Sequence, residues 1–523
     1  MEILKRLWHT YNSPRDSTTL SSLDTMDLGP TKNTENPVMI QFFTWDCKHP
    51  EMSWWSFFEK TVPDLESLGF TQVWLPPPHK AMSKNGQGYD AYDLWDLGEF
   101  DQKGTVPTRW GTKSELLRAV AVAKQHGIDV IIDAVLNHKL GADQRERFEV
   151  TPVDPKDRMK EIGPPRVIEG STRFNFPGRG SKYSALKWNH NHLTGVDWDH
   201  TTKKREVYRM ANKTWSSRVD DELGNYDYLL GVDIDHNHPE VVKDLLAWGN
   251  WVLQTTGGNG FRLDAIKHID RQFLRRFIQH TRQLTNRPRL FVVAEYWSAD
   301  IKRVMFWINA YGGLASFFDV PLHDNFWRAS EAGPRYDLRK ILANTVVSLR
   351  PKDAVTFVDN HEQIGQSLQS WVLRGFKLHA YALILLRDEG HPCVFFGDLY
   401  PNKECYDAGT ASGLRTLLKI RKNVASGPVA DYWEDANYIG WVRRGRGHKI
   451  CAVIISNADP ASSSKPHSIR MFVGKGHGQD AFKNAFAPRS AGIKLSGDGW
   501  GDFTCIRGGV AVWTLLSNIA ACV

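Results

Sequence analysis

Acidic side chains follow three apolar runs of this 523-residue sequence, where buried strands would end. Asp264 comes two residues after Arg262 in "GFRLDAI" (260–266), Glu295 follows "FVVA", and Asp359 follows "DAVTFV". A single carboxylate at such a place is usually a helix cap or one half of an ion pair. Three of them, beside an arginine and two histidines, cost stability unless the groups are paired, and a function explains the cluster better than a role in the scaffold. The pattern therefore favours an active site.

The surroundings of Asp264 suit a nucleophile, and those of Glu295 suit a general acid. Residues two apart on a strand point to the same face, so Arg262 and Asp264 lie side by side. The guanidinium would lower the pKa of Asp264 by about 1–3 and keep it ionised, although a structural ion pair is the alternative for these two residues alone. Neighbouring carboxylates would raise the pKa of Glu295 and keep it protonated. Such a pair, about 5–5.5 Å apart, cleaves a glycosidic bond with retention of configuration.

Eight short apolar runs alternate with amphipathic segments that read as helices, several of which end in glycine. This alternation predicts a (β/α)8 barrel, in which reacting groups project from the C-terminal ends of the strands. A doubly wound open sheet is the alternative, but no GxGxxG follows the first run. The runs are residues 38–45, 70–77, 129–138, 260–266, 289–297, 314–322, 353–361 and 391–398.

The spacing of these runs predicts additional domains. About 120 residues separate the third run from the fourth, far more than one connection needs, so we expect an inserted, irregular domain there. After about residue 427, five short β-like runs predict an antiparallel sandwich. The predicted parts are an N-terminal, loosely attached arm (1–36), the barrel (37–138 and 239–426), the inserted domain (139–238) and the C-terminal β domain (427–523).

Composition excludes several classes of partner and points to a reducing compartment. The net charge of +7 comes from scattered basic residues, which argues against a nucleic-acid-binding stripe. No window reaches 18 apolar residues, and the N-terminus lacks the apolar core of a secretory signal. The six cysteines are far apart and show no metal-binding spacing. We expect a cytoplasmic monomer that binds neither membrane nor nucleic acid.

Four motifs at the predicted strand ends resemble those of glycoside hydrolase family 13, the α-amylase family. They are "DAVLNH" (133–138), "GFRLDAIKH" (260–268), "VAEYW" (293–297) and "FVDNHE" (357–362). In this order, on the third, fourth, fifth and seventh strands, they are highly specific, and the likeness extends from about residue 37 to 516. "NYDYLLGVDIDHNHP" and "GDGWGDF" are most similar to the branch of bacterial liquefying and fungal intracellular α-amylases.

The resemblance implies a role for each motif residue. Asp264 would be the nucleophile, Glu295 the acid/base and Asp359 the residue that stabilises the transition state, while Asp133 would brace the strand ends. Around the attacked glucose the resemblance implies Arg262, His138 and His361, with Tyr89 stacked on the ring, Lys267 and His268 on the leaving side, and Trp297 as a further aromatic surface.

The resemblance also implies one calcium ion between the barrel and the inserted domain. The matching positions are Asn137, Asp227, Asp233 and the backbone carbonyl of His268, and their oxygens are the donors that calcium prefers. Without the resemblance, the acidic loop around Asp227 would be read as solvated.

Four substitutions, three of them at one metal site, set this chain apart from the family pattern. Bacterial members often carry a further sodium and calcium, but three of the carboxylates that would bind them appear here as Thr194, Ser216 and Asn237. We therefore expect no second calcium site. Glu362 stands where the pattern usually has aspartate, which predicts an altered sugar contact or loop geometry.

Three readings of the function stay open at this point. A 4-α-glucanotransferase would use the same residues as an α-1,4-glucan hydrolase. A non-catalytic carbohydrate-binding barrel would have lost at least one of the three carboxylates, and all three are present. A relative acting on α-1,6 bonds, or an isomerising one, is disfavoured by "VAEYW" and by "AIKH" (265–268).

Overall fold

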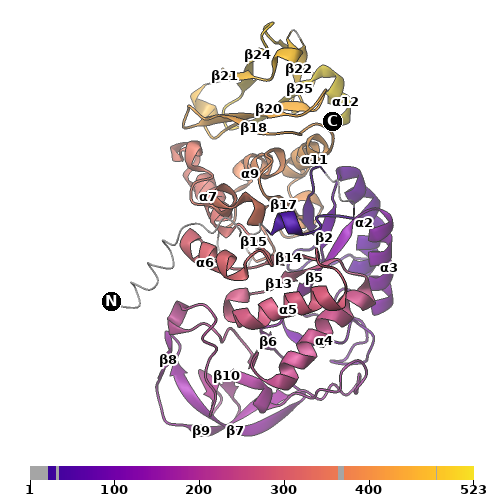
Figure 1. The fold of residues 1–523 in the computed structure, drawn as a ribbon, viewed down its shortest axis with the longest axis vertical. Coiled ribbons are helices and arrows are strands. Elements are labelled where there is room, and N and C mark those ends of the chain that lie inside the picture. The colour runs from indigo at the N-terminus through magenta and orange to yellow at the C-terminus, as the bar shows by residue number, and fades with distance from the viewer. Residues whose placement is uncertain (1–21, 31–34, 363–369, 464, 479, 523) are drawn as a thin grey trace.

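The computed structural model describes residues 22–30, 35–362, 370–463, 465–478 and 480–522 (Figure 1). A closed barrel of parallel strands occupies the middle of the molecule. An antiparallel sheet formed by the segment after β5 lies at one end, and the C-terminal strands lie at the other (Figure 1). The (β/α)8 fold predicted from the alternating runs is confirmed.

Eight strands close the barrel, and every residue in them is buried. The order around the barrel is β1-β17-β16-β15-β14-β13-β5-β2, and each neighbouring pair is parallel. Parallel strands covered by helices need apolar residues on both faces, which explains the continuous runs. The strands are β1 (Met39–Gln41), β2 (Gln72–Trp74), β5 (Asp129–Ala134), β13 (Gly260–Leu263), β14 (Phe291–Ala294), β15 (Ser316–Phe318), β16 (Ala354–Phe357) and β17 (His391–Phe395).

The strands are shorter than the runs that predicted them. Asp264, Glu295 and Asp359 lie just beyond the last residues of β13, β14 and β16. The third apolar run was expected to end as a strand at Asn137 and His138. Instead, β5 stops at Ala134, and His138 begins a strand of the next sheet. The chain leaves the barrel at this point, so the polar residues can turn toward its mouth.

Helices surround the barrel, and local sequence sets where they begin and end. Thr112 and Glu115 form a reciprocal capping box at the start of α3. Gly69 ends α2 and Gly257 ends α4, both with a left-handed backbone. The helices are α2 (Trp54–Leu68), α3 (Lys113–Gln125), α4 (Pro239–Thr256), α5 (Arg271–Leu284), α6 (Ile301–Tyr311), α7 (Val320–Ala332), α8 (Val346–Leu349), α9 (Arg374–Leu386), α10 (Phe396–Leu399) and α11 (Ala408–Asn423).

The segment after β5 is an ordered sheet, so the expectation of an irregular domain was wrong. Its strands follow the order β6-β12-β10-β11-β7-β8, and β9 pairs with β7. Burial alternates along part of β9, which is the pattern of a strand with one face on a core. The many loop-forming residues had hidden this alternation. The strands are β6 (His138–Lys139), β7 (Gln144–Asp154), β8 (Asp157–Glu161), β9 (Arg166–Arg173), β10 (Leu193–Asp199), β11 (Lys204–Met210) and β12 (Val232–Ile234).

The C-terminal strands form a six-stranded antiparallel sheet and a separate two-stranded one. All five predicted runs are strands, and the aromatic and β-branched residues of their inner faces form a core of their own. The strands are β18 (Val429–Tyr432), β19 (Tyr438–Arg444), β20 (Ile450–Ser456), β21 (His467–Phe472), β22 (Ala481–Asn484), β23 (Ile493–Lys494), β24 (Trp500–Cys505) and β25 (Val510–Leu515).

Part of the N-terminal arm is packed against the barrel. Residues 1–21 and 31–34 lie outside the described residues, but residues 22–30 contact the N-terminal ends of the strands. Met26 is buried, the backbone N–H of Ser22 donates to Asp353 (2.8 Å), and Arg289 pairs with Asp27 (2.7 Å). Residues 22–30 are therefore not loosely attached, because Met26 packs into the hydrophobic core. The mostly polar sequence around Met26 gave no sign of this contact.

Candidate active site

Arg262 stands at the centre of a buried ion cluster at the mouth of the barrel. Its Nη1 lies 3.0 Å from Asp133 Oδ1 and 2.6 Å from Asp264 Oδ1, and its Nη2 lies 2.5 Å from Glu295 Oε1. The arginine side chain is fully buried. The two carboxylates predicted to do the chemistry therefore rest on the two arms of one guanidinium. This arrangement holds the two carboxylates close together.

The residue that follows Asp264 has a strained backbone and contacts Glu295. Ala265 has a φ of 47°, in the left-handed region that non-glycine residues seldom adopt. In this conformation its backbone N–H donates to Glu295 Oε2 (3.0 Å). Strain at such a position is usually retained where function requires the geometry. Here the turn after Asp264 also orients the second carboxylate.

The charge states differ in one respect from the sequence prediction. The pKa of Asp264 is raised to about 6, because burial outweighs the lowering caused by Arg262. The expected net lowering of the Asp264 pKa was therefore wrong, because removing the carboxylate from water outweighs one charge that it shares with Asp133 and Glu295. Burial also raises the pKa of Glu295, with a contribution from Asp264. That direction agrees with the prediction, although burial is the larger cause.

Aromatic rings form a wall beside the ion cluster. Tyr89 stacks on His361 with ring centres 5.0 Å apart, and its hydroxyl donates to Asp133 Oδ2 (2.8 Å). His138 donates from Nε2 to the backbone carbonyl of Tyr89 (2.8 Å). Trp45 stacks on both rings of the pair, with centres 5.7 and 5.9 Å away. Trp45 was missed because it ends the first apolar run and read as part of that strand.

One ring nitrogen in this wall makes no protein hydrogen bond within the described part of the chain. Gln41 donates to His361 Nδ1 (2.9 Å), so the proton of the neutral ring lies on Nε2. Among the described residues, His361 Nε2 is buried and has no hydrogen-bond partner. Burial lowers the pKa of His361 well below its usual range, which keeps the ring neutral. It can donate to a ligand.

Asp359 does not join the Arg262 cluster. Its Oδ2 lies 2.9 Å from Lys377 Nζ, and Lys377 also contacts Asp398 (2.5 Å). Neither Lys377 nor Asp398 was selected from the sequence. A single lysine in the apolar segment "GFKLHAYALILL" (375–386) was the available signal.

The remaining predicted substrate ligands lie at the edge of the site. Lys267 pairs with Glu222 (2.7 Å), and His268 donates from Nδ1 to the backbone carbonyl of Tyr226 (2.7 Å). Trp297 is half-buried and packs against His323 and Phe357. No contact in the described residues joins these three side chains to the Arg262 cluster.

Glu362 adds a further carboxyl near the same mouth. Its backbone N–H donates to Asn360 Oδ1 (2.8 Å). Burial raises the pKa of Glu362 well above its usual range, and the charge of Glu295 adds to the rise. A protonated carboxyl can donate a hydrogen bond, which aspartate at this position could do only from a shorter side chain. The predicted change of sugar contact stays a prediction.

Three of the four predicted calcium ligands, Asn137, Asp227 and Asp233, are buried side chains. Asn137 Oδ1 and Asp233 Oδ1 are buried and have no hydrogen-bond partner among the described residues. Burial raises the pKa of Asp227 to about 8, and burial with the Asp227 charge raises that of Asp233 well above its usual range. Without a cation such buried carboxyls are held in the protonated form, and a divalent ion would let them stay ionised. These oxygens therefore fit calcium.

Protein cations neutralise the acidic residues beside these predicted ligands. Lys213 lies 2.6 Å from Asp235, and Arg218 lies 2.9 Å from Asp270 and donates to Asn237 Oδ1 (3.1 Å). The three substituted positions are hydrogen-bonded within the protein, since Thr194 donates to Asp233, Ser216 donates to Asp270 (2.9 Å), and Asn237 accepts from Arg218.

His192, His238 and Glu240 form another group whose ligand atoms lie within 4.8 Å of one another. The backbone N–H of Asn189 donates to His192 Nδ1 (3.0 Å), which puts the ring proton on Nε2, facing Glu240 at 3.3 Å. An ion on Nε2 would have to displace that proton. Calcium also prefers oxygen donors, so this group does not fit calcium.

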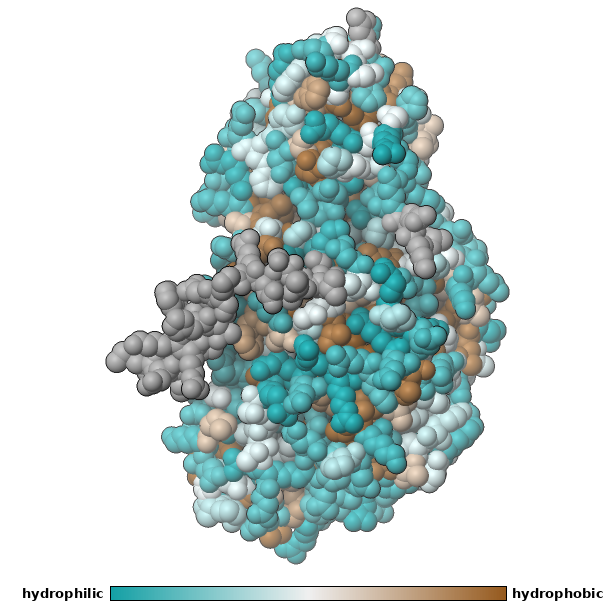
Figure 2. Space-filling view, in the orientation of Figure 1, coloured by the Kyte–Doolittle hydropathy of each residue, from teal (hydrophilic) through white to brown (hydrophobic). Residues whose placement is uncertain are grey.

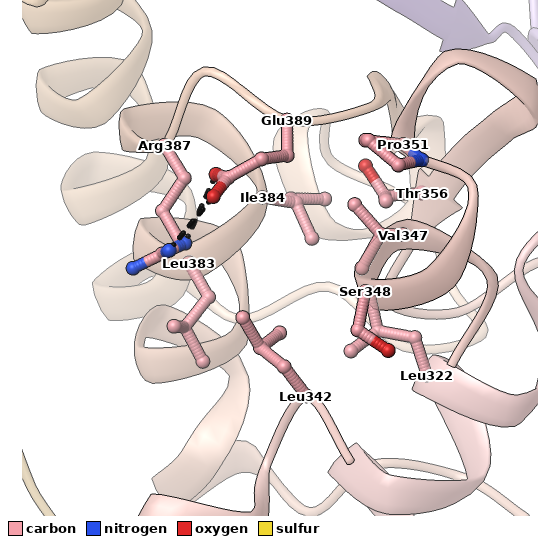
Figure 3. Close-up of a pocket in the computed structure, with 10 residues that line it drawn as sticks. All are labelled: Leu322, Leu342, Val347, Ser348, Pro351, Thr356, Leu383, Ile384, Arg387 and Glu389. Carbon is pink, nitrogen blue, oxygen red and sulfur yellow. Dashed lines mark hydrogen bonds and ion pairs between the residues drawn. The ribbon is translucent and has the colours of Figure 1, made fainter. Parts of the chain in front are cut away.

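A cavity of about 330 Å³ lies away from these residues, between β16 and helices α7, α8 and α9 (Figure 3). Leucine, valine and isoleucine make up half of its lining residues, and the Arg387–Glu389 ion pair lies at one side (Figure 3). None of the predicted site residues lines it. The chemistry therefore belongs to the barrel mouth.

Comparison with known proteins agrees with this geometry. The family described as "Alpha amylase, catalytic domain" matches residues 59–405. The chain belongs to the α-amylase family. Within it, the α-amylase of Geobacillus stearothermophilus is 42% identical over 496 residues, covering 93% of this chain and 89% of that protein. The cytoplasmic α-amylase of Escherichia coli (strain K12) is 35% identical and covers 92% and 99%.

A solved α-amylase has the same fold. The Geobacillus thermoleovorans α-amylase, complexed with acarbose, has a TM-score of 0.60 at 17% identity and covers 92% of this chain and 98% of its own. Family membership makes the chain a glycoside hydrolase of the α-amylase type and confirms the resemblance seen in the four motifs.

The described residues contain no helix long and apolar enough to cross a membrane. On the face shown in Figure 2, hydrophilic residues predominate, and hydrophobic ones appear as small separate areas.

Proposed function

We propose that the protein hydrolyses α-1,4-glucans internally and with retention of configuration. The observation that carries the proposal is the grip of one guanidinium on both Asp264 and Glu295. Two carboxyls that share one guanidinium lie close to each other, as the carboxyls of retaining glycosidases do, whereas an inverting enzyme needs a wider gap that admits a water. A short separation instead suits direct attack by one carboxylate.

The reaction runs in two displacements. Asp264 attacks the anomeric carbon while Glu295 gives its proton to the departing glycosidic oxygen, so the C–O bond breaks and a glycosyl ester forms. Glu295, now ionised, takes a proton from water, and the resulting nucleophile breaks the ester. Burial supports both roles of Glu295, because its raised pKa lets it hold a proton and then regain one.

The surrounding residues hold the sugar. The Tyr89 ring offers a stacking face for the attacked glucose, and the N–H of His361 can donate to a sugar hydroxyl. Asp359 grips hydroxyl groups as positive charge develops on the ring. His138 supports Tyr89, while Lys267, His268 and Trp297 act toward the leaving side.

A 4-α-glucanotransferase is the alternative, because a sugar hydroxyl could replace water in the second displacement. Incubation with maltoheptaose, sampled over time, separates the two activities. We expect products shorter than the substrate from the first time point. Accumulation of chains longer than seven glucose units before the short ones would identify a transferase. No cleavage by folded protein would contradict both.

We propose one structural calcium ion, held by Asn137, Asp227, Asp233 and the backbone carbonyl of His268. When bound, it supplies charge that balances the two buried carboxylates. It would tie the inserted sheet to the loop after β5, next to His138. Lys213 and Arg218 support a single site, since they already neutralise the neighbouring acids.

Removal of calcium is expected to lower thermal stability. An ion that binds only the folded protein stabilises it by about 2.7 kcal/mol at a hundredfold excess over Kd. Melting in calcium and in EDTA, with metal analysis of dialysed protein, measures this effect. We expect close to one calcium per chain and a lower melting temperature in EDTA.

Two neighbouring variants provide the control. Asp233→Asn removes a proposed ligand and should abolish the response to EDTA. Asp235→Asn changes a carboxylate that is paired with Lys213 and should leave the response intact. A stoichiometry of two or three, or melting indifferent to EDTA in the unmodified protein, would refute the single site.

We also propose a reducing, cytoplasmic location and a monomeric state without membrane or nucleic-acid partners. All six cysteines are free thiols, and burial raises the pKa of each one. Fractionation of native cells tests the location, and recovery of the protein in the medium would contradict it.

A further inference from the structure

Asp359 is held from two sides after it leaves β16. The backbone N–H of Val372 donates to its Oδ1 (3.2 Å), and Lys377 Nζ lies 2.9 Å from its Oδ2. The side chains of Asp359 and Lys377 are 0% and 4% exposed. Lys377 belongs to α9, on the outer layer of the barrel, and reaches inward to the catalytic end. The positive charge of Lys377 therefore acts on Asp359 inside the site.

Lys377 divides that charge between two carboxylates. Its Nζ also lies 2.5 Å from Asp398 Oδ1, and Asp398 accepts a second hydrogen bond from the hydroxyl of Tyr381 (2.7 Å). The Trp371 ring closes the remaining side, with its centre 3.4 Å from Nζ. These contacts leave the ammonium group one fixed position.

The other titratable groups around Asp359 do not supply a positive charge. His323, on α7, has its Nδ1 3.9 Å from Asp359, but that nitrogen donates to the backbone carbonyl of Val358 (2.6 Å). Burial lowers the pKa of His323 to about 4, so its ring is neutral. Tyr381 and Cys405 face the group and are uncharged at neutral pH. Of the described residues, Lys377 alone brings a full positive charge within ion-pair distance.

We propose that Lys377 is a positioning residue that holds the Asp359 carboxylate in place and ionised, and that Asp398 sets how strongly Lys377 acts on it. The inference rests on the transition-state role proposed above for Asp359. Lys377 touches no reacting atom itself.

The two neighbours act on Asp359 with opposite sign. The pKa of Asp359 is raised to about 7 as the net result of burial, which raises it most, Lys377, which lowers it, and Asp398, which adds to the rise. Loss of Lys377 should therefore raise the pKa of Asp359, whereas loss of the Asp398 charge should lower it. Ionised Asp359 is the active form, so the acidic limb of the rate profile reports the change.

We expect two variants to move that limb in opposite directions. In Lys377→Met, the acidic limb of kcat/KM should shift to higher pH, and in Asp398→Asn it should shift to lower pH, each by about one pH unit. A purely structural role would lower the rate at every pH without opposite shifts. Lys377→Arg keeps the charge and should restore most of the position of the limb.

Asp264 also titrates on the acidic side of the rate profile, so a shift of that limb has to be traced to Asp359 rather than to Asp264. The same two substitutions in an Asp359→Asn protein, followed with an activated aryl malto-oligosaccharide, should leave the limb unmoved. If Lys377→Met does not fold, Asp398→Asn decides alone, because it leaves the Lys377–Asp359 pair intact.

The outcomes separate this inference from the proposed function. High activity of Asp359→Asn would remove the catalytic role of Asp359. If Asp359→Asn has lost most of its activity on malto-oligosaccharides and the limb of Asp398→Asn stays in place or moves to higher pH, the positioning role of Lys377 is wrong.

Discussion

Asp264→Asn is expected to fold normally and to lose nearly all turnover, by at least about 10⁴-fold in kcat. The amide cannot form the glycosyl ester through which the first displacement passes. The fold should survive because Arg262 keeps its ion pairs with Asp133 and Glu295. Steady-state kinetics on a malto-oligosaccharide and a melting curve measure the two effects. More than a few per cent of the original rate would show that Asp264 is not the nucleophile.

Asp133→Asn is the matched control, since Asp133 is equally buried and pairs with the same arginine. It accepts hydrogen bonds from Trp74 (2.9 Å), Tyr89 (2.8 Å) and Arg262 (3.0 Å), so its charge braces three side chains. Hydrogen bonds to a charged group contribute about 1.5–3 kcal/mol each. We therefore expect the reverse profile, with a large fall in melting temperature and a smaller loss of kcat than in Asp264→Asn.

The barrel, and the reacting residues at its strand ends, were predictable because they depend on short stretches of sequence. Apolar runs that must be buried on both faces predict parallel strands, and the residues that follow them share one end of the barrel. Asp264, Glu295 and Asp359 each follow a strand for this reason. The contact between Arg262 and Asp264 was likewise expected from their spacing.

Long-range contacts were not predictable in the same way. The net pKa of Asp264 depends on how many carboxylates share Arg262, and those come from three different strands. Lys377 lies 18 positions after Asp359, on a helix whose other residues are mostly apolar. Trp45 reaches the site only because β1 closes the barrel. The inserted sheet was predicted to be irregular because the segment that forms it is rich in glycine, proline, asparagine, aspartate and aromatic residues.

The ion cluster also explains why strand-end residues of different types act as one unit. Arg262 cannot serve Asp264 without also serving Asp133 and Glu295, so a change at any of them alters the charge seen by the others. Asp359 has its own cation in Lys377 and stands apart from this set. The site therefore combines two separately balanced groups, one for bond cleavage and one for gripping the sugar.

Glu295→Gln is expected to abolish cleavage of glucans and to spare much of the reaction with α-maltosyl fluoride. Glutamine cannot give a proton to a sugar leaving group, whereas fluoride departs without one. The kcat/KM of the unmodified enzyme should fall as pH rises through the pKa of Glu295, which burial raises, because the acid must be protonated. That basic limb should disappear in the variant. Kinetics on both substrates across pH measure these effects, and Asp264→Asn, which should fail on both, is the control. Equal losses on the two substrates, or an unchanged basic limb on the fluoride, would show that Glu295 is not the general acid.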